Sequence, residues 1–251
     1  MTLLRLFIFC AIFCVWTNAL LTSSPRAFVP SLVRPGYGTS KLQMSLDPVQ
    51  VAAGGLVAVG GNAVPSALAA YGHYLGLVLV SMSLAVERIL VKPGMSIENE
   101  KVMGYADIVY GIAGVLVLYT GYLRVTEYGK GWEFYQHEPV FWVKMLLFSI
   151  MGASSLFPTI KIIQRAIKIN DAEKGKGEMP ALLSEALATR MKKVINGELL
   201  AIGSIPLTAA LMSRGVGYAD WFQWQAGAGV VGLSVVGLGF KYTREALQFK
   251  E

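Results

Sequence analysis

The amino-acid sequence predicts an all-α protein, a polytopic bundle of transmembrane helices. Two features indicate this class. Hydrophobic residues make up 54% of the 251 residues and charged residues only 15%, whereas about a quarter of the residues in a soluble domain are charged. The apolar residues are also grouped in long blocks, and a helix needs about 20 apolar residues to cross a bilayer.

The first 44 residues have the layout of a targeting sequence. Residues 1–19, "MTLLRLFIFCAIFCVWTNA", combine one arginine, a short apolar core and a small-residue end, as signal peptides do. Residues 20–44 are basic, rich in hydroxyl groups and free of acids, which is typical of a transit peptide. The combination resembles the two-part plastid presequence of algae with a secondary red plastid, with Phe28 near the junction. The alternative is a secreted or endomembrane protein with a loose N-terminal tail.

Five apolar segments of spanning length follow the presequence. A glycine-rich stretch at residues 45–65 is expected to be a flexible entry segment rather than a sixth helix. Residues 66–240 are expected to form the transmembrane helical domain, and residues 241–251 a basic C-terminal tail. The spans are predicted near residues 66–86, 105–123, 140–160, 194–213 and 221–240.

Basic residues predict the orientation of these spans. We call the membrane surface before the first span side A and the opposite surface side B. The loops on side B hold most of the lysines and arginines, whereas side A has only Arg124, Lys130 and Arg214. Since basic loops remain on the cytoplasmic side of a membrane, side B is expected to be the stroma, with the protein in the thylakoid or the inner envelope of a plastid.

The largest connection between spans, residues 161–193, is expected on side B. Within it, Pro180 is placed to open a helix, because proline is accepted in a first helical turn. The apolar side chains that follow form one stripe, made of Leu183, Leu187, Met191 and Val194. This spacing predicts an amphipathic helix at the stromal surface.

The central spans carry the pattern of a known family. The segment "ADIVYGIAGVLVLYTGYLRVTEYGKGWEFYQHEPVFWVKMLLFSIMGASSLFPTIKII" resembles an uncharacterised bacterial family of predicted membrane proteins, domain of unknown function 2214. The resemblance covers about residues 71–215 and implies four helices and no assigned reaction, so the fifth span is an addition. It rests on His73, Glu87, Asp107, Tyr110, Gly111, Gly121, Arg124, Gly129, Lys130, Gly131, Tyr135, His137, Phe141, Lys144, Phe148, Pro158, Thr159, Met212, Arg214 and Gly215.

A looser resemblance concerns a possible cofactor. The layout is similar to that of membrane-type protoporphyrinogen oxidases, which bind haem b and pair a first-span histidine with a Trp-x-x-Lys element. Here "FWVK", which contains Trp142 and Lys144, resembles that element, and His73 is the first-span histidine. The resemblance implies haem b as a cofactor of this chain.

Four polar side chains near side A are candidate ligands for haem or an anionic group: His73, Arg124, His137 and Lys144. Lys144 lies about 7–8 Å along the helix from Pro139, so its stem can extend to the interface. One interpretation is therefore a snorkelling or carboxylate-paired lysine. The other is a binding cation that, with Arg124 and Lys130, faces a propionate, a carboxylate or a lipid phosphate.

The two histidines of the chain have different expected environments. His73 lies within a span, where an unpaired polar group costs several kcal/mol. We therefore expect a hydrogen bond to a Tyr or Ser on a neighbouring span, with haem or chlorophyll-type ligation and proton relay as alternatives. His137 is closer to water, and a loop-capping or interfacial role is expected for it.

Three acidic side chains near side B are candidates for proton handling: Glu87, Asp107 and Glu198. Glu87 ends the first span beside Arg88, and Asp107 begins the second span, where the helix dipole favours an acid. We expect structural pairing of Asp107 with Arg88. A proton-handling carboxylate pair is the alternative. Glu198 lies in the first turns of the fourth predicted span.

Several site classes are excluded. Both cysteines, Cys10 and Cys14, lie in the predicted signal peptide. Cleavage would leave no thiol for disulfides, nucleophiles, thiolate zinc sites or iron–sulfur clusters. No metal site is expected, because no metal-ligand cluster is recognisable in the sequence. The net charge of +6 follows from the basic loops of side B, so nucleic acid is not an expected partner.

These observations favour a non-enzymatic membrane protein embedded in the lipid bilayer. The expected role is an auxiliary or scaffold subunit of a photosystem or another plastid membrane complex, because the fifth span is rich in glycines that permit close helix packing. One alternative is a haem b-binding redox protein or oxidase-like enzyme that uses His73 and Lys144. Another is a small transporter that uses Glu87, Asp107 and Glu198.

Overall fold

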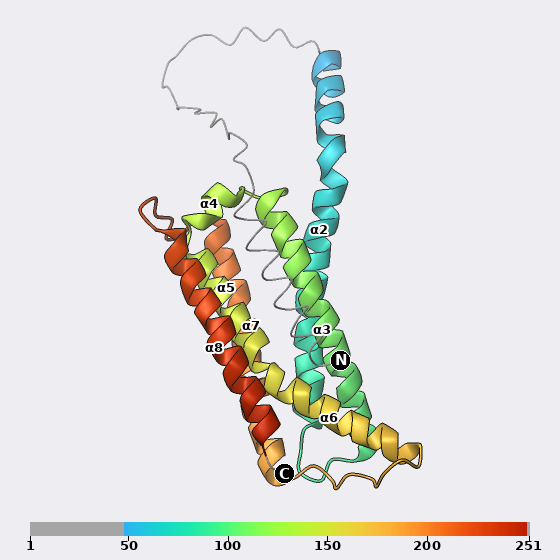
Figure 1. The fold of residues 1–251 in the computed structure, drawn as a ribbon. Coiled ribbons are helices and arrows are strands. Elements are labelled where there is room, and N and C mark those ends of the chain that lie inside the picture. The colour runs from blue at the N-terminus through green and yellow to red at the C-terminus, as the bar shows by residue number, and fades with distance from the viewer. Residues whose placement is uncertain (1–47, 250–251) are drawn as a thin grey trace. The chain divides into compact units, whose positions relative to one another are not determined.

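The computed structural model describes residues 48–249, and the side chains of residues 63–249. The predicted signal and transit peptides lie outside the described residues. The described part of the chain is all-helical, which confirms the predicted fold class (Figure 1). Its helices are α2 (Pro48–Leu90), α3 (Ile97–Thr126), α4 (Trp132–Gln136), α5 (Pro139–Ser154), α6 (Leu156–Glu173), α7 (Glu185–Ser213) and α8 (Trp224–Gln248).

Five segments among the described residues are long and apolar enough to cross a membrane, judged by length and composition. They are Ala63–Leu90, Ile97–Thr126, Pro139–Glu173, Glu185–Ser213 and Trp224–Gln248. The number of spans therefore agrees with the prediction. The first four segments extend beyond their apolar blocks at one end or both, whereas the last begins at Trp224 rather than at residue 221 and includes most of the predicted C-terminal tail.

Helix α2 also includes the stretch 48–65, where the sequence predicts a flexible entry segment. Its glycines do not interrupt the helix there. The chain divides into two units between Leu68 and Ala69. Of the first unit only the helix is described, and the candidate site residues lie in the second.

Polar caps explain why α3 and α7 begin before their apolar blocks. The Ser96 side chain accepts a hydrogen bond from the backbone N–H of Asn99 at the start of α3, and Ser184 accepts one from the N–H of Leu187 at the start of α7. Such caps satisfy backbone donors that have no partner within the helix. The helix expected to open at Pro180 therefore begins only after Ser184.

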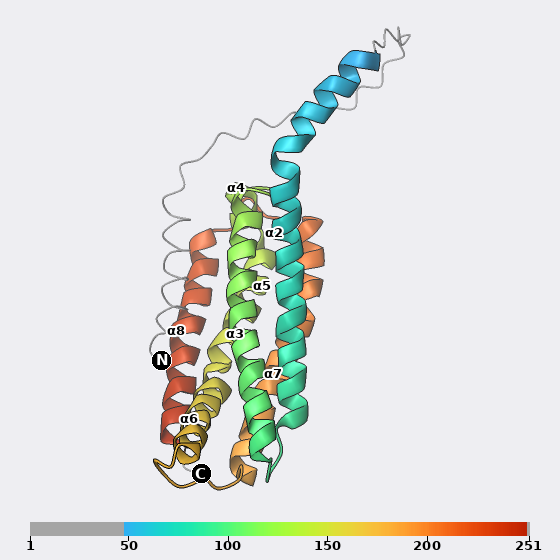
Figure 2. The ribbon, with the colours of Figure 1, turned by 90° about the vertical axis from the view of Figure 1, so that its right-hand side faces the viewer.

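The third predicted span is divided by a bend between α5 and α6. Pro158, in the first turn of α6, has no backbone N–H to complete the helical ladder, and such a gap bends helices. Helix α5 packs mainly against α7 and α8, whereas α6 packs against α8 and α3. Figures 1 and 2 show α6 leaving the direction of α5 at this point.

The apolar stripe expected on the membrane surface lies in the protein core instead. Its four side chains, Leu183, Leu187, Met191 and Val194, are all buried. The correction has a simple physical reason. Because α7 runs without a break from this region into the fourth span, its apolar stripe faces the neighbouring helices α5 and α6 rather than lipid.

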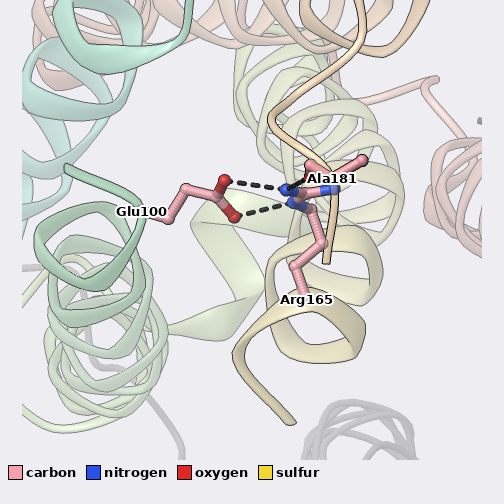
Figure 3. Close-up of polar contacts among 3 residues, drawn as sticks. All are labelled: Glu100, Arg165 and Ala181. Carbon is pink, nitrogen blue, oxygen red and sulfur yellow. Dashed lines mark hydrogen bonds and ion pairs between the residues drawn. The ribbon is translucent and has the colours of Figure 1, made fainter. Parts of the chain in front are cut away.

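A buried ion pair fastens the connection between α6 and α7 (Figure 3). The Arg165 guanidinium donates hydrogen bonds to both carboxylate oxygens of Glu100 on α3, at 2.7 and 2.8 Å. It also donates one to the carbonyl oxygen of Ala181, at 2.7 Å. The segment before α7 is therefore held against α3 and α6 at the side B end of the bundle.

Glycines allow close contacts between helices at two places. A Cβ added to Gly76 on α2 would lie 2.6 Å from a methyl carbon of Val117 on α3. A Cβ added to Gly227 on α8 would lie 2.4 Å from the Trp142 ring on α5. Small residues at such positions permit the approach of transmembrane helices. Trp142 is accordingly buried between helices.

Candidate functional site

Three carboxyl groups from three helices are buried in the bundle. Glu87 of α2 and Asp107 of α3 are each 3% exposed, and Glu198 of α7 is 1% exposed. The three interact electrostatically with one another. We call Glu87, Asp107 and Glu198 the acid cluster. The structure thus brings together the three side chains that the sequence indicated as candidates for proton handling.

Hydroxyl groups on either side of the α5–α6 bend donate hydrogen bonds to the acid cluster. The Ser154 hydroxyl donates to Oε1 of Glu198 at 3.4 Å, and the Thr159 hydroxyl donates to Oδ1 of Asp107 at 2.5 Å. Tyr110 of α3 interacts electrostatically with all three carboxyl groups and forms a side-chain hydrogen bond with Ser155.

Two oxygens of the acid cluster have no hydrogen-bond partner among the described residues. They are Oε1 of Glu87 and Oε2 of Glu198. Buried polar atoms are normally hydrogen-bonded, and each exception calls for an explanation.

Glu198 lies about 20 Å along α7 from Glu185, by a rise of 1.5 Å per residue. Because α7 begins earlier than the sequence indicated, Glu198 is near the middle of its helix rather than in the first turns.

The structure also gives Arg88 a different partner from the one expected. Its guanidinium donates to the side-chain oxygen of Asn196 on α7, at 2.5 Å. The Asp107 carboxyl, which was expected beside Arg88, accepts a hydrogen bond from Thr159. Arg88 instead connects the side B end of α2 to α7.

A second group of polar side chains lies toward side A. The Nδ1 atom of His73 is 3.1 Å from the Val117 carbonyl oxygen and 3.2 Å from the Thr120 hydroxyl oxygen, both on α3. Gly121 makes room for the ring, since a Cβ there would lie 3.1 Å from Cε1 of His73. The hydroxyl partner is thus a threonine, where the sequence suggested a Tyr or Ser.

Two cations belong to this second group. The Arg124 guanidinium lies 5.2 Å from the centre of the Tyr74 ring, and Nζ of Lys144 lies 5.4 Å from the centre of the Phe141 ring. Both charges act on His73, and the charge of Arg124 also acts on Lys144. Of the sequence candidates for a cofactor site, the structure therefore associates His73, Arg124 and Lys144.

His137 is part of a different contact. It ends the short helix α4, and its Nδ1 atom lies 3.0 Å from the Phe222 carbonyl oxygen. Its own carbonyl accepts a hydrogen bond from the N–H of Ala219. His137 therefore joins α4 to the loop before α8.

Cofactor or metal binding would need specific atoms of these groups. If His73 held a haem, its Nε2 atom would be the ligand, because Nδ1 is within hydrogen-bonding distance of Val117 and Thr120. Among the described residues, no three His, Cys, Asp or Glu side chains are placed to hold a metal ion.

Glu138 is a buried acid that the sequence analysis missed. It precedes α5, is 0% exposed, and neither carboxylate oxygen has a hydrogen-bond partner among the described residues. Burial raises the pKa of the Glu138 carboxyl above its usual 4.5, and the nearby Lys130 charge opposes this more weakly. The sequence did contain a signal for this residue. Glu138 is an acid within an aromatic loop, directly before Pro139, the proline that opens α5.

No curated protein and no solved structure gives a significant match to the chain. One family model matches residues 65–217, and its description is "Predicted membrane protein (DUF2214)". The matched range contains the acid cluster, His73, Arg124 and Lys144, whereas α8 lies beyond it. The match covers more than half of the chain, which therefore belongs to this family of predicted membrane proteins.

Proposed function

We propose that this protein moves protons across a membrane, with the acid cluster as its proton-binding site. The observation that supports this function is the burial of Glu198 near the middle of α7, with one carboxylate oxygen unpartnered among the described residues. Ionisable residues inside a membrane are costly and are found where protons, ions or substrates pass.

The chemistry of the cluster favours a proton as the bound species. The groups that act on Glu198 are its two carboxyl neighbours and the Ser154 hydroxyl. Two buried carboxyl groups that repel each other do not both remain ionised without a neutralising partner. We therefore expect at least one of Glu87 and Glu198 to be protonated. The Ser154 and Thr159 hydroxyls lie close enough to exchange hydrogen bonds with the cluster as that proton moves.

Reconstitution tests this function directly. The purified chain is placed in vesicles that contain a pH-sensitive dye, and a membrane potential is imposed with potassium and valinomycin. We expect proton flux that Glu198→Gln reduces to the level of protein-free vesicles. The control is Glu98→Gln, which removes an exposed acid from α3 and should leave the flux unchanged.

Two further measurements make the result decisive. Thermal unfolding of the Glu198→Gln variant must show that it is folded. Infrared spectra should contain the C=O band of a protonated carboxyl group in the wild-type protein and a weaker band in the variant. Equal flux through wild-type and folded Glu198→Gln protein would refute the proposal.

A role as an auxiliary subunit of a membrane complex is the second candidate, and α8 supports it. Gly227 and Gly239 of this helix contact side chains of the bundle. A Cβ added to Gly229, Gly232 or Gly237 would meet nothing within 4 Å. Open glycines on a membrane helix permit close approach of a partner helix, and α8 lies beyond the family match.

The subunit role has its own test. On a native gel of detergent-solubilised membranes, the wild-type chain should migrate with a larger complex, such as a photosystem, and Gly232→Leu should migrate alone. Gly203→Leu on α7 is the matched control, because a Cβ at Gly203 also meets nothing within 4 Å. Migration of the wild-type chain by itself would argue against a partner.

The proposed site of action is a plastid membrane, thylakoid or inner envelope, with side B at the stroma. This proposal depends on residues 1–44, whose composition is that of a two-part presequence. A fluorescent protein fused after residue 44 should enter the plastid of a red-lineage alga. Secretion of the fusion, or its retention in the endoplasmic reticulum, would contradict the plastid assignment.

A further inference from the structure

The Thr159 hydroxyl has a different kind of acceptor from many other helical hydroxyls of this chain. A serine or threonine within a helix commonly donates to a carbonyl oxygen three or four residues earlier. The side chains that do so here are Ser81, Thr120, Thr126, Ser149, Ser155, Ser204, Thr208, Ser213 and Ser234. The Thr159 hydroxyl of α6 instead donates to Oδ1 of Asp107 on α3, at 2.5 Å.

The bend between α5 and α6 explains why Thr159 reaches Asp107. Thr159 follows Pro158 in the first turn of α6, and α6 packs against α3. The backbone N–H of Thr159 still donates to the Ser155 carbonyl oxygen, at 3.0 Å, so only the side chain departs from the helical pattern. Because Asp107 is 3% exposed, bulk water does not compete for this hydroxyl.

The length of the bond between Thr159 and Asp107 is informative about its acceptor. An O–H donor lies about 2.5–2.7 Å from an ionised carboxylate oxygen, closer than the about 2.7–2.8 Å of an ordinary O–H···O bond. A hydrogen bond donated to the charged form of a carboxyl group also stabilises that form. The contact between Thr159 and Asp107 is therefore the one expected for an ionised Asp107.

The hydroxyl beside Glu198 gives weaker support to a negative charge. Oγ of Ser154 lies 3.0 Å from the Met151 carbonyl oxygen of its own helix and 3.4 Å from Oε1 of Glu198. A hydroxyl has one proton to donate, so the nearer carbonyl competes with the carboxyl. Oε2 of Glu198 and Oε1 of Glu87 have no hydrogen-bond partner among the described residues. The three carboxyl groups thus have unequal environments.

We infer that Thr159 is a positioning residue of the acid cluster: its hydroxyl holds Asp107 as the ionised carboxylate and leaves the bound proton to Glu198 and Glu87. This inference rests on the proposed function and gives the carboxyl groups of that site different roles, as different environments do elsewhere. Asp107 interacts electrostatically with Glu87 of α2, Tyr110 of α3 and Glu198 of α7. A fixed negative charge on Asp107 favours a proton on the glutamates, because like charges repel.

Infrared spectra of the full-length protein, recorded across a pH series, test this assignment. Thr159→Val keeps the branched shape of the side chain and removes its hydroxyl. The pH at which half of Asp107 is protonated, measured from the C=O band of its carboxyl group, should rise by about 1–2 pH units, as the loss of a hydrogen bond to a charged group predicts. Thr159→Ser, which keeps a hydroxyl, should titrate as the wild-type protein does.

Isotope labelling assigns the bands even if Thr159→Val fails to fold. Aspartate labelled with ¹³C moves the bands of aspartic acids and leaves those of glutamic acids in place. In the wild-type protein at neutral pH, we expect the C=O band of the buried protonated carboxyl to be unmoved by the label and retained in Asp107→Asn. A band that moves with the label and disappears in Asp107→Asn would mean that Asp107 itself carries the proton, which overturns the inference.

Thr208→Val is the matched control for the hydroxyl. Thr208 lies on α7, and its hydroxyl donates to the Ile205 carbonyl oxygen of the same helix, at 2.8 Å. This variant should leave the titration of Asp107 unchanged. A Thr159 with a purely structural role would lower the unfolding temperature in Thr159→Val without moving the titration. Equal titration of Asp107 in Thr159→Val and Thr208→Val would therefore refute the positioning role.

The spectra need no transport, so they separate this inference from the proposed function. Proton flux that depends on Glu198, combined with an unmoved titration of Asp107 in Thr159→Val, would overturn the inference and leave the proposed function in place. A moved titration in a protein without proton flux would support the role of Thr159 and overturn the proposed function alone.

Discussion

The Arg165 guanidinium holds both carboxylate oxygens of Glu100, and the two side chains are 4% and 3% exposed. Removal of one partner from a buried ion pair leaves an uncompensated charge, whereas joint replacement by apolar residues is much less costly. We therefore expect Arg165→Met to destabilise the protein by about 3–5 kcal/mol. Unfolding in mixed detergent, followed by circular dichroism, measures this change.

The double variant supplies the control for this prediction. Glu100→Leu combined with Arg165→Met should be more stable than Arg165→Met alone, because no buried carboxylate remains without its partner. If the double variant lost as much stability as the two single changes added together, the pair would not act as a unit.

The contact between Gly227 and Trp142 predicts that the same substitution will cost different amounts of stability at two glycines of α8. Gly227→Leu should destabilise the protein by about 1–3 kcal/mol or more, because overpacking forces side chains from their preferred positions and a Cβ would lie 2.4 Å from the indole. Gly229→Leu, which adds the same side chain where nothing lies within 4 Å, should change stability little. Thermal unfolding followed by tryptophan fluorescence compares the two. Equal losses would mean that α8 does not pack against α5 through Gly227.

Glu138 predicts a dependence of stability on pH. Its pKa is raised in the folded protein by burial, so the folded state favours the protonated carboxyl. The resulting stabilisation is complete below the usual pKa of 4.5 and is lost as the pH rises through the raised value. Unfolding temperatures of the wild-type protein should therefore fall more steeply above pH 4.5 than those of Glu138→Gln. Parallel curves for the two proteins would remove Glu138 as the cause.

The five-span topology predicts that the two ends of the bundle are accessible from opposite sides of the membrane. Figure 1 shows α4 at one end and the connection between α6 and α7 at the other. In a parent chain without Cys10 and Cys14, single cysteines are introduced by Glu133→Cys in α4 and Glu178→Cys in the connection, both exposed positions. A membrane-impermeant maleimide applied to sealed membranes should label only one of them. Labelling of both from the same side would refute the five-span topology.

Much of the fold could be predicted because it depends on local composition. Each apolar block indicated a helix, and the alternation of spans followed from their number. The starts of α3 and α7 were not recognised, since Ser96 and Ser184 stand before polar turns that a search for apolar blocks does not include. The bend near Ser155 could have been anticipated from Pro158, which lies within the third predicted span.

The site was predictable only as a set of unconnected residues. Glu87, Asp107 and Glu198 stood out because acids are rare in spanning segments. Their meeting depends on which faces α2, α3 and α7 turn toward one another, and that is decided by contacts such as Gly76 against Val117. Glu138 escaped notice because it stands before the predicted third span, and its burial is produced by the folded chain rather than by its neighbours in sequence.

The bend between α5 and α6 has a mechanical consequence. Ser154 and Thr159 stand on opposite sides of it and hold different carboxyl groups, Glu198 and Asp107. A rotation of α6 about this point would withdraw Thr159 while leaving Ser154 in place. Because Arg165 joins α6 both to Glu100 of α3 and to the stretch before α7, a displacement of that loop would act on α6 and, through it, on the hydrogen bond between Thr159 and Asp107.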